Sequence, residues 1–236
     1  FYVKMHIQLQ QNDLSYPFAF NPATVGFKVP VNQQKIVWNI PANVAMPKNK
    51  NDLAFYSIMQ LASLIKNKKI TSVELTKFFI DRLKKWGDTL QSVITLTEDL
   101  AMQQAKQADD EISKGNYKGP LHGIPYGIKD LFAVKGYKTT WGSTPYMDQT
   151  LDYDSYVYTK VKEAGGVLCA KLSLGAVAYN NKWFGGETKN PWNLQQGSSG
   201  SSAGSASSVV AGLLPFTIGT ETLGSIVSPS TRCGAT

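Results

Sequence analysis

Gly166-Val167-Leu168-Cys169-Ala170-Lys171 is a short, largely apolar run that is typical of a buried β-strand. Residues 157–164, directly before it, have the pattern of a helix. Further upstream, Gly123-Ile124-Pro125-Tyr126-Gly127-Ile128-Lys129-Asp130 indicates a turn that leads into another strand. Because helices alternate with strands, the sequence predicts an α/β fold in which α-helices cover both faces of a β-sheet.

Three helices are expected before these strands. Apolar side chains recur at helical spacing within residues 58–65, and Asp52 is the expected N-cap of that helix. Thr71 and Glu74 have the spacing of a capping box, which predicts the start of a second helix. A third helix is predicted over residues 98–113, where apolar residues line one face.

The chain divides into two parts by composition. Residues 1–50 contain five prolines, which break helices, so this part is expected to be an irregular or β-rich N-terminal extension. Residues 51–236 are expected to form the N-terminal part of one α/β domain. The last residues lack the composition of a helix end or a tail, so the chain is expected to end inside a larger fold, truncated at the C-terminus.

Composition narrows the class of protein. Of the 236 residues, 42% are hydrophobic and 17% are charged, which is enough apolar material for a sizeable core. The net charge of +7 is spread along the chain, so it indicates a solvated surface rather than a nucleic-acid-binding stripe. No apolar run reaches the roughly 18 residues that a membrane span needs. Localisation stays open, since the chain begins at Phe1 and a cytoplasmic protein or one exported after removal of a signal both fit.

The two cysteines, Cys169 and Cys233, are too few and too far apart for a disulfide framework or a zinc site. We therefore expect no metal. Cys169 lies in the buried strand run, where packing is its expected role.

A Gly/Ser segment, Gly197-Ser198-Ser199-Gly200-Ser201-Ser202-Ala203-Gly204-Ser205-Ala206-Ser207-Ser208, is the most unusual part of the chain. A flexible linker is one interpretation. However, the segment leads into residues 209–214, whose apolar character predicts a buried helix. A Gly/Ser loop before a helix gathers backbone N–H groups around one point, which suits a developing negative charge.

Ser225 lies in Gly219-Thr220-Glu221-Thr222-Leu223-Gly224-Ser225-Ile226, where the preceding glycine permits a tight turn that can present a hydroxyl to a cleft. A serine nucleophile needs a base. His6 lies in the extension, and a structural role is the stronger interpretation of His122 in its turn. Lys129 has apolar flanks, and burial would favour its neutral form, whereas the plain alternative is a surface lysine at a strand end.

These three segments, in this order, resemble the amidase signature family of serine amidohydrolases. The resemblance rests on Gly-Ile-Pro-Tyr-Gly-Ile-Lys-Asp, the Gly/Ser loop and Gly-Thr-Glu-Thr-Leu-Gly-Ser, with 24 residues from Ser201 to Ser225, and it runs from about Asp52 to Thr236. It implies a mixed β-sheet flanked by α-helices on both faces.

The resemblance also implies a role for each matching residue. Lys129 corresponds to the catalytic lysine, Ser201 to the bridging serine that follows a cis peptide bond, and Ser225 to the nucleophile. The resemblance further implies an oxyanion hole formed by the backbone N–H groups of Thr222, Leu223, Gly224 and Ser225. It implies that the hydroxyls of Ser202 and Thr220 orient the three catalytic residues.

The chain departs from the family pattern around the expected nucleophile. Glu221 stands where the family often has Asp, Leu223 where it has Gly, and Val227 where it has Arg. Without that Arg, no nearby guanidinium is expected to hold a substrate carboxylate. One possible consequence is that Arg232 pairs with Glu221 instead.

The predicted activity is hydrolysis of a carboxylic amide in a small-molecule substrate, through a seryl acyl-enzyme and without a metal or organic cofactor. A homodimer is possible. The first alternative is the glutaminase subunit of a tRNA-dependent amidotransferase, which would contact nucleic acid and work with a partner subunit. The second is an inactive binding protein on the same fold, against which an intact Lys-Ser-Ser set argues.

Overall fold

The computed structural model describes residues 26–28, 32 and 36–236. The chain separates into two compact units, residues 1–37 and 38–236. In the first unit, the described residues contain no helix or strand. Most of the predicted N-terminal extension, residues 1–50, therefore lies outside the described residues, and its irregular or β-rich character stays a prediction.

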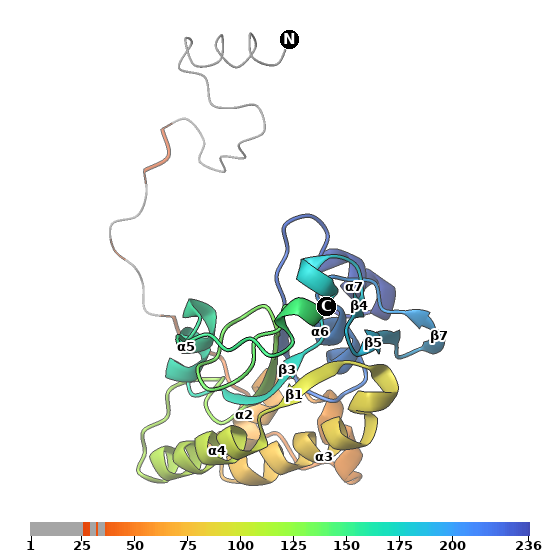
Figure 1. Ribbon diagram of the computed structural model, residues 1–236. Helices are drawn as coiled ribbons and strands as arrows, with labels where there is room; N and C mark the ends of the chain where they lie inside the picture. Colours follow the sequence, from red (N-terminus) through yellow and green to blue (C-terminus); the bar gives the residue numbers. More distant parts are fainter. Residues whose placement is uncertain (1–25, 29–31, 33–35) are drawn as a thin grey trace. The chain divides into compact units, whose positions relative to one another are not determined.

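The second unit contains a mixed sheet of four strands (Figure 1). Its strand order is β1-β3-β2-β8, with bounds Val93–Leu96 for β1, Pro125–Lys129 for β2, Val167–Leu172 for β3 and Thr217–Ile218 for β8. β2 runs parallel to both β3 and β8, while β1 is antiparallel to β3. β2 and β3 are buried along their whole length and coincide with the two predicted strands.

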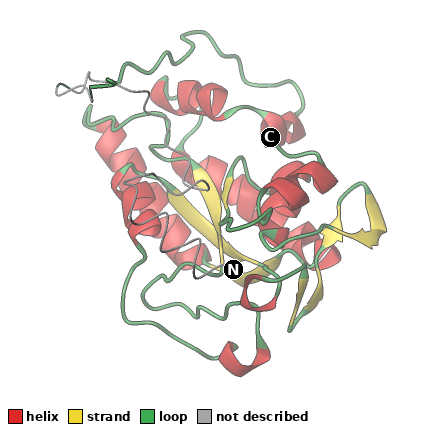
Figure 2. Ribbon diagram, turned by 90° about the horizontal axis from the view of Figure 1, so that it is seen from above, coloured by secondary structure: helices red, strands yellow, loops and turns green. Residues whose placement is uncertain are grey.

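Two clusters of apolar side chains lie on opposite faces of this sheet. In β3, Val167 and Cys169 belong to the larger cluster, which the helices before β2 complete, whereas Leu168 belongs to a smaller cluster with Tyr158 of α5 (Tyr156–Glu163). This alternation follows from the two-residue period of a strand. Figure 2 shows the central strands with helices on either side. The predicted α/β fold with helices on both faces is confirmed.

The helices of the larger cluster are α2 (Ile58–Lys66), α3 (Ser72–Leu90) and α4 (Glu98–Ser113). α3 and α4 lie side by side (Figure 1). The Thr71–Glu74 capping box is present, and α4 has the predicted bounds. Asp52, however, does not cap α2. It lies inside a 3₁₀ helix, η1 (Lys50–Phe55), and α2 begins after Ser57, which forms a capping box of its own.

The helix predicted over residues 209–214 is wrong. α6 spans Ala203–Val210, so it begins inside the Gly/Ser segment and ends where the apolar run begins. Small side chains make this possible, because the helix packs closely against neighbouring backbone. A Cβ atom on Gly204 would lie 2.4 Å from the Ser92 carbonyl oxygen and 2.6 Å from the Ser173 nitrogen. Tertiary packing here overrides the weak helix propensity of glycine and serine.

The remaining elements are short. They are α7 (Val227–Cys233), the 3₁₀ helices η2 (Thr144–Tyr146) and η3 (Ala176–Ala178), and two strand pairs, β4 (Lys182–Trp183) with β5 (Gly186–Glu187) and β6 (Lys189–Asn190) with β7 (Asn193–Gly197).

Candidate active site

Lys129 is the last residue of β2, at the carboxyl end of a strand that is parallel to both of its neighbours. Ligands of open α/β sheets bind beyond these strand ends. The Lys129 side chain is completely buried. The strand approaches its neighbours closely, since a Cβ atom on Gly127 would lie 2.6 Å from side-chain atoms of Leu172 and Leu214.

Three hydroxyl groups surround the Lys129 amine. Nζ lies 2.7 Å from Ser201 Oγ, 2.9 Å from Thr220 Oγ1 and 3.1 Å from Ser202 Oγ, with the Thr220 carbonyl oxygen at 3.4 Å. No carboxylate forms an ion pair with this amine among the described residues. Burial lowers the pKa of Lys129 to about 8, because desolvation penalises the ammonium form. A lysine in this environment can accept a proton near neutral pH.

Ser201 and Ser202 lie at the start of α6. The Gly200–Ser201 peptide bond is cis, as predicted. Gly200 is required by its surroundings, because a Cβ atom there would lie 1.9 Å from the Asn180 carbonyl oxygen. Ser202 Oγ also donates to the Thr220 carbonyl oxygen over 3.0 Å, so this hydroxyl joins the Gly/Ser segment to the loop after β8.

Ser225 is half-buried in that same loop and follows Gly224, whose φ of 80° is a left-handed conformation that favours glycine. The Ser225 carbonyl oxygen accepts a hydrogen bond from the Ser202 backbone nitrogen over 2.9 Å. The Ser225 hydroxyl, in contrast, donates to no group among the described residues. The structure therefore brings Lys129, Ser201, Ser202 and Thr220 into direct contact and joins Ser225 to them through the backbone.

The predicted oxyanion residues precede and include Ser225. Among the described residues, the backbone N–H groups of Thr222, Leu223 and Ser225 have no acceptor, so they are available to a ligand. Leu223 is 93% exposed. The backbone N–H group of Gly224, the fourth predicted residue, instead interacts with the Glu221 carboxylate and helps to lower its pKa.

Glu221 does not pair with Arg232, which corrects that expectation. Its carboxylate oxygen Oε2 instead accepts hydrogen bonds from the backbone nitrogens of Val227, over 2.7 Å, and Ile226, over 2.6 Å. These bonds lower the pKa of the Glu221 carboxyl group. They close a loop around residues 222–225.

The polar contacts of His122 are to residues outside this network. It is completely buried, its Nδ1 accepts a hydrogen bond from the Lys118 backbone nitrogen, and its Nε2 lies 3.0 Å from Glu111 Oε2. Burial lowers the pKa of His122. The structural role favoured from the sequence agrees with these contacts.

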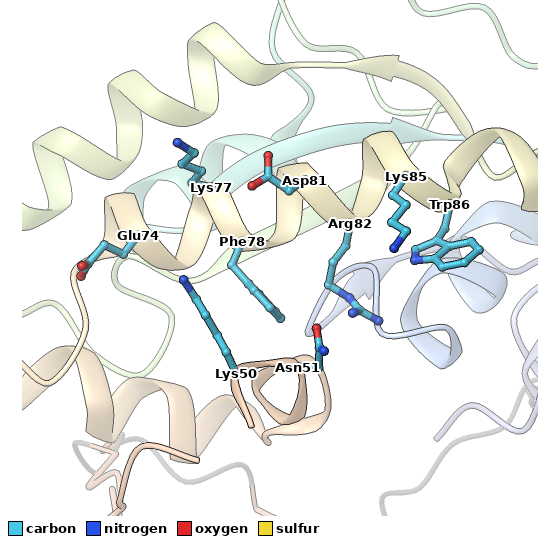
Figure 3. A pocket seen from close by; sticks show the side chains of 9 residues that line it. All are labelled: Lys50, Asn51, Glu74, Lys77, Phe78, Asp81, Arg82, Lys85 and Trp86. Atoms are coloured by element: carbon cyan, nitrogen blue, oxygen red, sulfur yellow. The ribbon is translucent and has the colours of Figure 1, made fainter. Parts of the chain in front are cut away.

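A pocket of about 280 Å³ borders the site. Ser202, Ser205 and Gly219 form its polar and glycine-lined edge, and the apolar part of its wall includes Val209 and Ile226. A separate groove lies between η1 and α3 (Figure 3). It is lined by Lys50, Asn51, Glu74, Lys77, Phe78, Asp81, Arg82, Lys85 and Trp86, none of which was predicted as a site residue.

Two buried charged residues near Lys129 were missed. Asp130 and Lys171 are both completely inaccessible to solvent, and Lys171 Nζ lies 2.5 Å from Asp130 Oδ1. Lys171 ends a sequence run that is typical of a buried strand. Because lysine is almost never fully buried without a partner, this position could have indicated a buried ion pair.

Within the part of the chain that the structure describes, no helix has the length and apolar character to cross a bilayer. The same residues contain no cluster of three or more His, Cys, Asp or Glu side chains that could hold a metal ion.

Comparison with known sequences points to one family. A family model described as Amidase matches residues 74–236. A glutamyl-tRNA(Gln) amidotransferase subunit from Coxiella burnetii (strain Dugway 5J108-111) is 40% identical over 183 residues, which cover 76% of this chain and 38% of that protein. The corresponding protein from Marinomonas sp. (strain MWYL1) is 42% identical over 184 residues, with 76% and 37% coverage. The chain thus spans just over a third of the length of these relatives.

Solved structures of amidases also superpose on this chain. The native peptide amidase from Stenotrophomonas maltophilia superposes with a TM-score of 0.71 at 32% identity, covering 76% of this chain and 39% of that one. A bacterial aryl acylamidase of the amidase signature family gives a TM-score of 0.71 at 28% identity, covering 75% and 37%.

Proposed function

This chain belongs to the amidase family, and we propose that it cleaves a carboxylic amide through an ester formed on Ser225. The observation that carries the proposal is the 2.7 Å contact between the Lys129 amine and the Ser201 hydroxyl, in a buried site where the amine has no carboxylate partner among the described residues. A neutral amine beside a serine hydroxyl is the arrangement that a lysine base needs.

The proposed reaction begins with two proton transfers. Lys129 takes the proton of Ser201 while Ser201 takes that of Ser225, and the Ser225 oxygen attacks the amide carbonyl carbon. Negative charge develops on the carbonyl oxygen, and the N–H groups of Thr222, Leu223 and Ser225, which have no acceptor among the described residues, donate to it. Thr220 and Ser202 orient the amine, since both hydroxyls lie within 3.1 Å of it.

Collapse of this intermediate breaks the C–N bond. The leaving amine receives a proton from Lys129 through Ser201, and the acyl group remains on Ser225 as an ester. Water then attacks the ester, loses its proton to the same relay, and releases the carboxylic acid. The proposed chemistry uses side chains and backbone groups of this chain and water.

The second candidate function is that of a glutaminase subunit that supplies ammonia to a partner. It is supported by the relatives named as glutamyl-tRNA(Gln) amidotransferase subunits, at about 40% identity. Val227, at a position where the family often has Arg, favours the first candidate, because glutamine carries a carboxylate that a guanidinium would hold.

An amide panel assayed on the native protein separates the two candidates. It contains glutamine, a neutral C-terminal peptide amide and an aryl amide. Hydrolysis of the neutral amides supports the first candidate. Ammonia release from glutamine alone, together with co-purification of a partner subunit, supports the second. A folded protein that fails to react with every amide and with a fluorophosphonate would contradict both and favour an inactive binding protein.

A further inference from the structure

The groove between η1 and α3 has a volume of about 460 Å³, which is within the range of small-molecule sites. None of the residues that line it belongs to the proposed catalytic set. Its walls come from one face of the 3₁₀ helix and from residues 74–86 of α3, and the space between them is open to solvent (Figure 3). The chemistry of these walls indicates what the groove can bind.

Three cationic side chains border the space between the two elements. Lys50 extends from η1 toward α3, while Arg82 and Lys85 extend from the facing side of α3 (Figure 3). Among the described residues, none of the three forms an ion pair with a carboxylate, in contrast to Lys84 on the same helix, which pairs with Glu98 over 2.6 Å. Their charges are therefore available to a ligand.

The two carboxylates of the groove are turned away or occupied. Asp81 extends away from η1, and Lys77, one turn before it, does the same (Figure 3). Glu74 Oε2 accepts hydrogen bonds from the Thr71 backbone nitrogen over 2.9 Å and from the Thr71 hydroxyl over 2.8 Å. The space between η1 and α3 thus has an excess of positive charge, which attracts an anion.

The Arg82 guanidinium is held in one orientation. Its Nε donates to the Gly212 carbonyl oxygen over 2.6 Å and its Nη2 to the Ala211 carbonyl oxygen over 3.2 Å, at the end of α6. A guanidinium has five N–H groups, so three of them have no acceptor among the described residues. Burial lowers the pKa of Arg82, because desolvation penalises the cation. A half-buried guanidinium with neutral acceptors is stabilised further by a negatively charged one.

Two aromatic rings line the same space. Phe78 packs edge-on against the completely buried Phe79, with ring centroids 5.0 Å apart, so the core fixes its position. The Trp86 side chain is 43% exposed. Arg82 Cζ lies 5.7 Å from the centre of the Phe78 ring, and Lys85 Nζ lies 4.9 Å from that of Trp86. Each ring is next to a cation, which suits a ligand that carries a planar ring beside an anionic group.

We propose that the groove between η1 and α3 is a binding site for a small aromatic anion, either a carboxylate or a phosphate ester. The anionic group accepts hydrogen bonds from Arg82 and Lys50, and the ring packs against Trp86. Because the guanidinium is already oriented, little entropy is lost when it binds. The inference goes beyond the proposed function, since the site uses no residue of the proposed reaction.

The test is isothermal titration calorimetry of the native protein with benzoate and phenyl phosphate, and with benzyl alcohol as the uncharged probe. At least one of the two anions should bind with a Kd below about 1 mM. Benzyl alcohol should bind more weakly than that anion, and the affinity for the anion should fall as the salt concentration rises. The anion that binds more tightly identifies the anionic group that the groove prefers.

Lys50→Met/Lys85→Met, the groove variant, removes two exposed cations and should raise the Kd about tenfold. Lys84→Met/Lys106→Met is the matched control, because it makes the same change of net charge at exposed positions of α3 and α4 outside the groove. Its Kd should equal that of wild type. Trp86→Leu keeps the cations, removes the aromatic face and should raise the Kd about fivefold.

Arg82 stays unchanged in this test, because its loss would also free the carbonyl groups at the end of α6. Circular dichroism identifies the variants that fold, and Lys50→Gln/Lys85→Gln replaces the groove variant if that does not. The proposal is overturned if neither anion binds with a Kd below about 1 mM, or if benzyl alcohol binds as tightly. It is also overturned if the groove variant and the control variant have the same Kd, or if Trp86→Leu binds as wild type.

Discussion

The Ser202 backbone nitrogen donates a hydrogen bond to the Ser225 carbonyl oxygen over 2.9 Å. This bond joins the start of α6 to the turn that carries the proposed nucleophile, and it involves the side chain of neither residue. Substitution of either side chain therefore leaves the link between the two segments in place. Losses of activity in such variants can be assigned to the missing hydroxyl groups.

Ser225→Ala should abolish covalent labelling by a fluorophosphonate and still fold, because the backbone link does not depend on the hydroxyl. The measurement is labelling followed by intact-protein mass spectrometry. Ser113→Ala, which removes an exposed hydroxyl at the end of α4, is the control and should be labelled as wild type. Labelling that persists in Ser225→Ala but disappears in Ser201→Ala would reverse the two proposed roles.

Activity should rise with pH through about 8 and then level off, because the pKa of Lys129 is lowered to about 8 and only the neutral amine accepts a proton. Lys129→Ala should reduce kcat/KM by about 10²- to 10⁴-fold. His122→Ala should retain most activity, since His122 contacts Lys118 and Glu111 rather than the site. The opposite result, with His122 essential and Lys129 dispensable, would point to a histidine base.

Lys129→Met should raise the stability of the folded protein at neutral pH while it abolishes activity. The folded-state pKa of about 8 lies below the ordinary value of 10.5, so protonating Lys129 costs more in the folded state than in the unfolded state. That cost, roughly 3 kcal/mol, is present in full below pH 8 and disappears as the pH rises to the unfolded-state pKa. Chemical unfolding at several pH values should show a gain that is largest below pH 8 and absent above 10.5. Equal stability of the two proteins at neutral pH would contradict this.

Glu221→Ala should lower kcat by about tenfold or more, because the two hydrogen bonds from Ile226 and Val227 that close the loop around residues 222–225 are lost. Glu221→Gln retains an acceptor oxygen and should lose less. KM should change little in both variants, since the loop acts on the developing oxyanion rather than on the bound substrate. Steady-state kinetics of the two variants gives both constants, and a change confined to KM would argue against this role of the loop.

Local sequence patterns predicted the elements whose stability is decided locally. The Thr71–Glu74 capping box starts α3, the apolar face of residues 98–113 forms α4, and the apolar runs that end at Lys129 and near Lys171 form β2 and β3. Periodicity carries this information, because a buried face recurs with the pitch of the element.

Two predictions of where helices begin and end were wrong. Asp52 does not cap α2, and the helix expected over residues 209–214 instead spans Ala203–Val210. In α6, close backbone contacts select small side chains, so a segment with the composition of a linker becomes a buried helix. The neighbours that impose this, near Ser92 and Ser173, are distant in sequence.

By itself, the sequence determined the order of the three motifs and the kinds of group they supply, namely one lysine and a set of hydroxyls. It did not determine which groups each buried lysine would contact. Lys129 reaches Ser201, which lies 72 positions away along the chain, while Lys171 pairs with the carboxylate directly after Lys129. Strand register decides this, because the pairing of β2 with β3 sets which side chains meet, and burial then makes an unpaired charge costly.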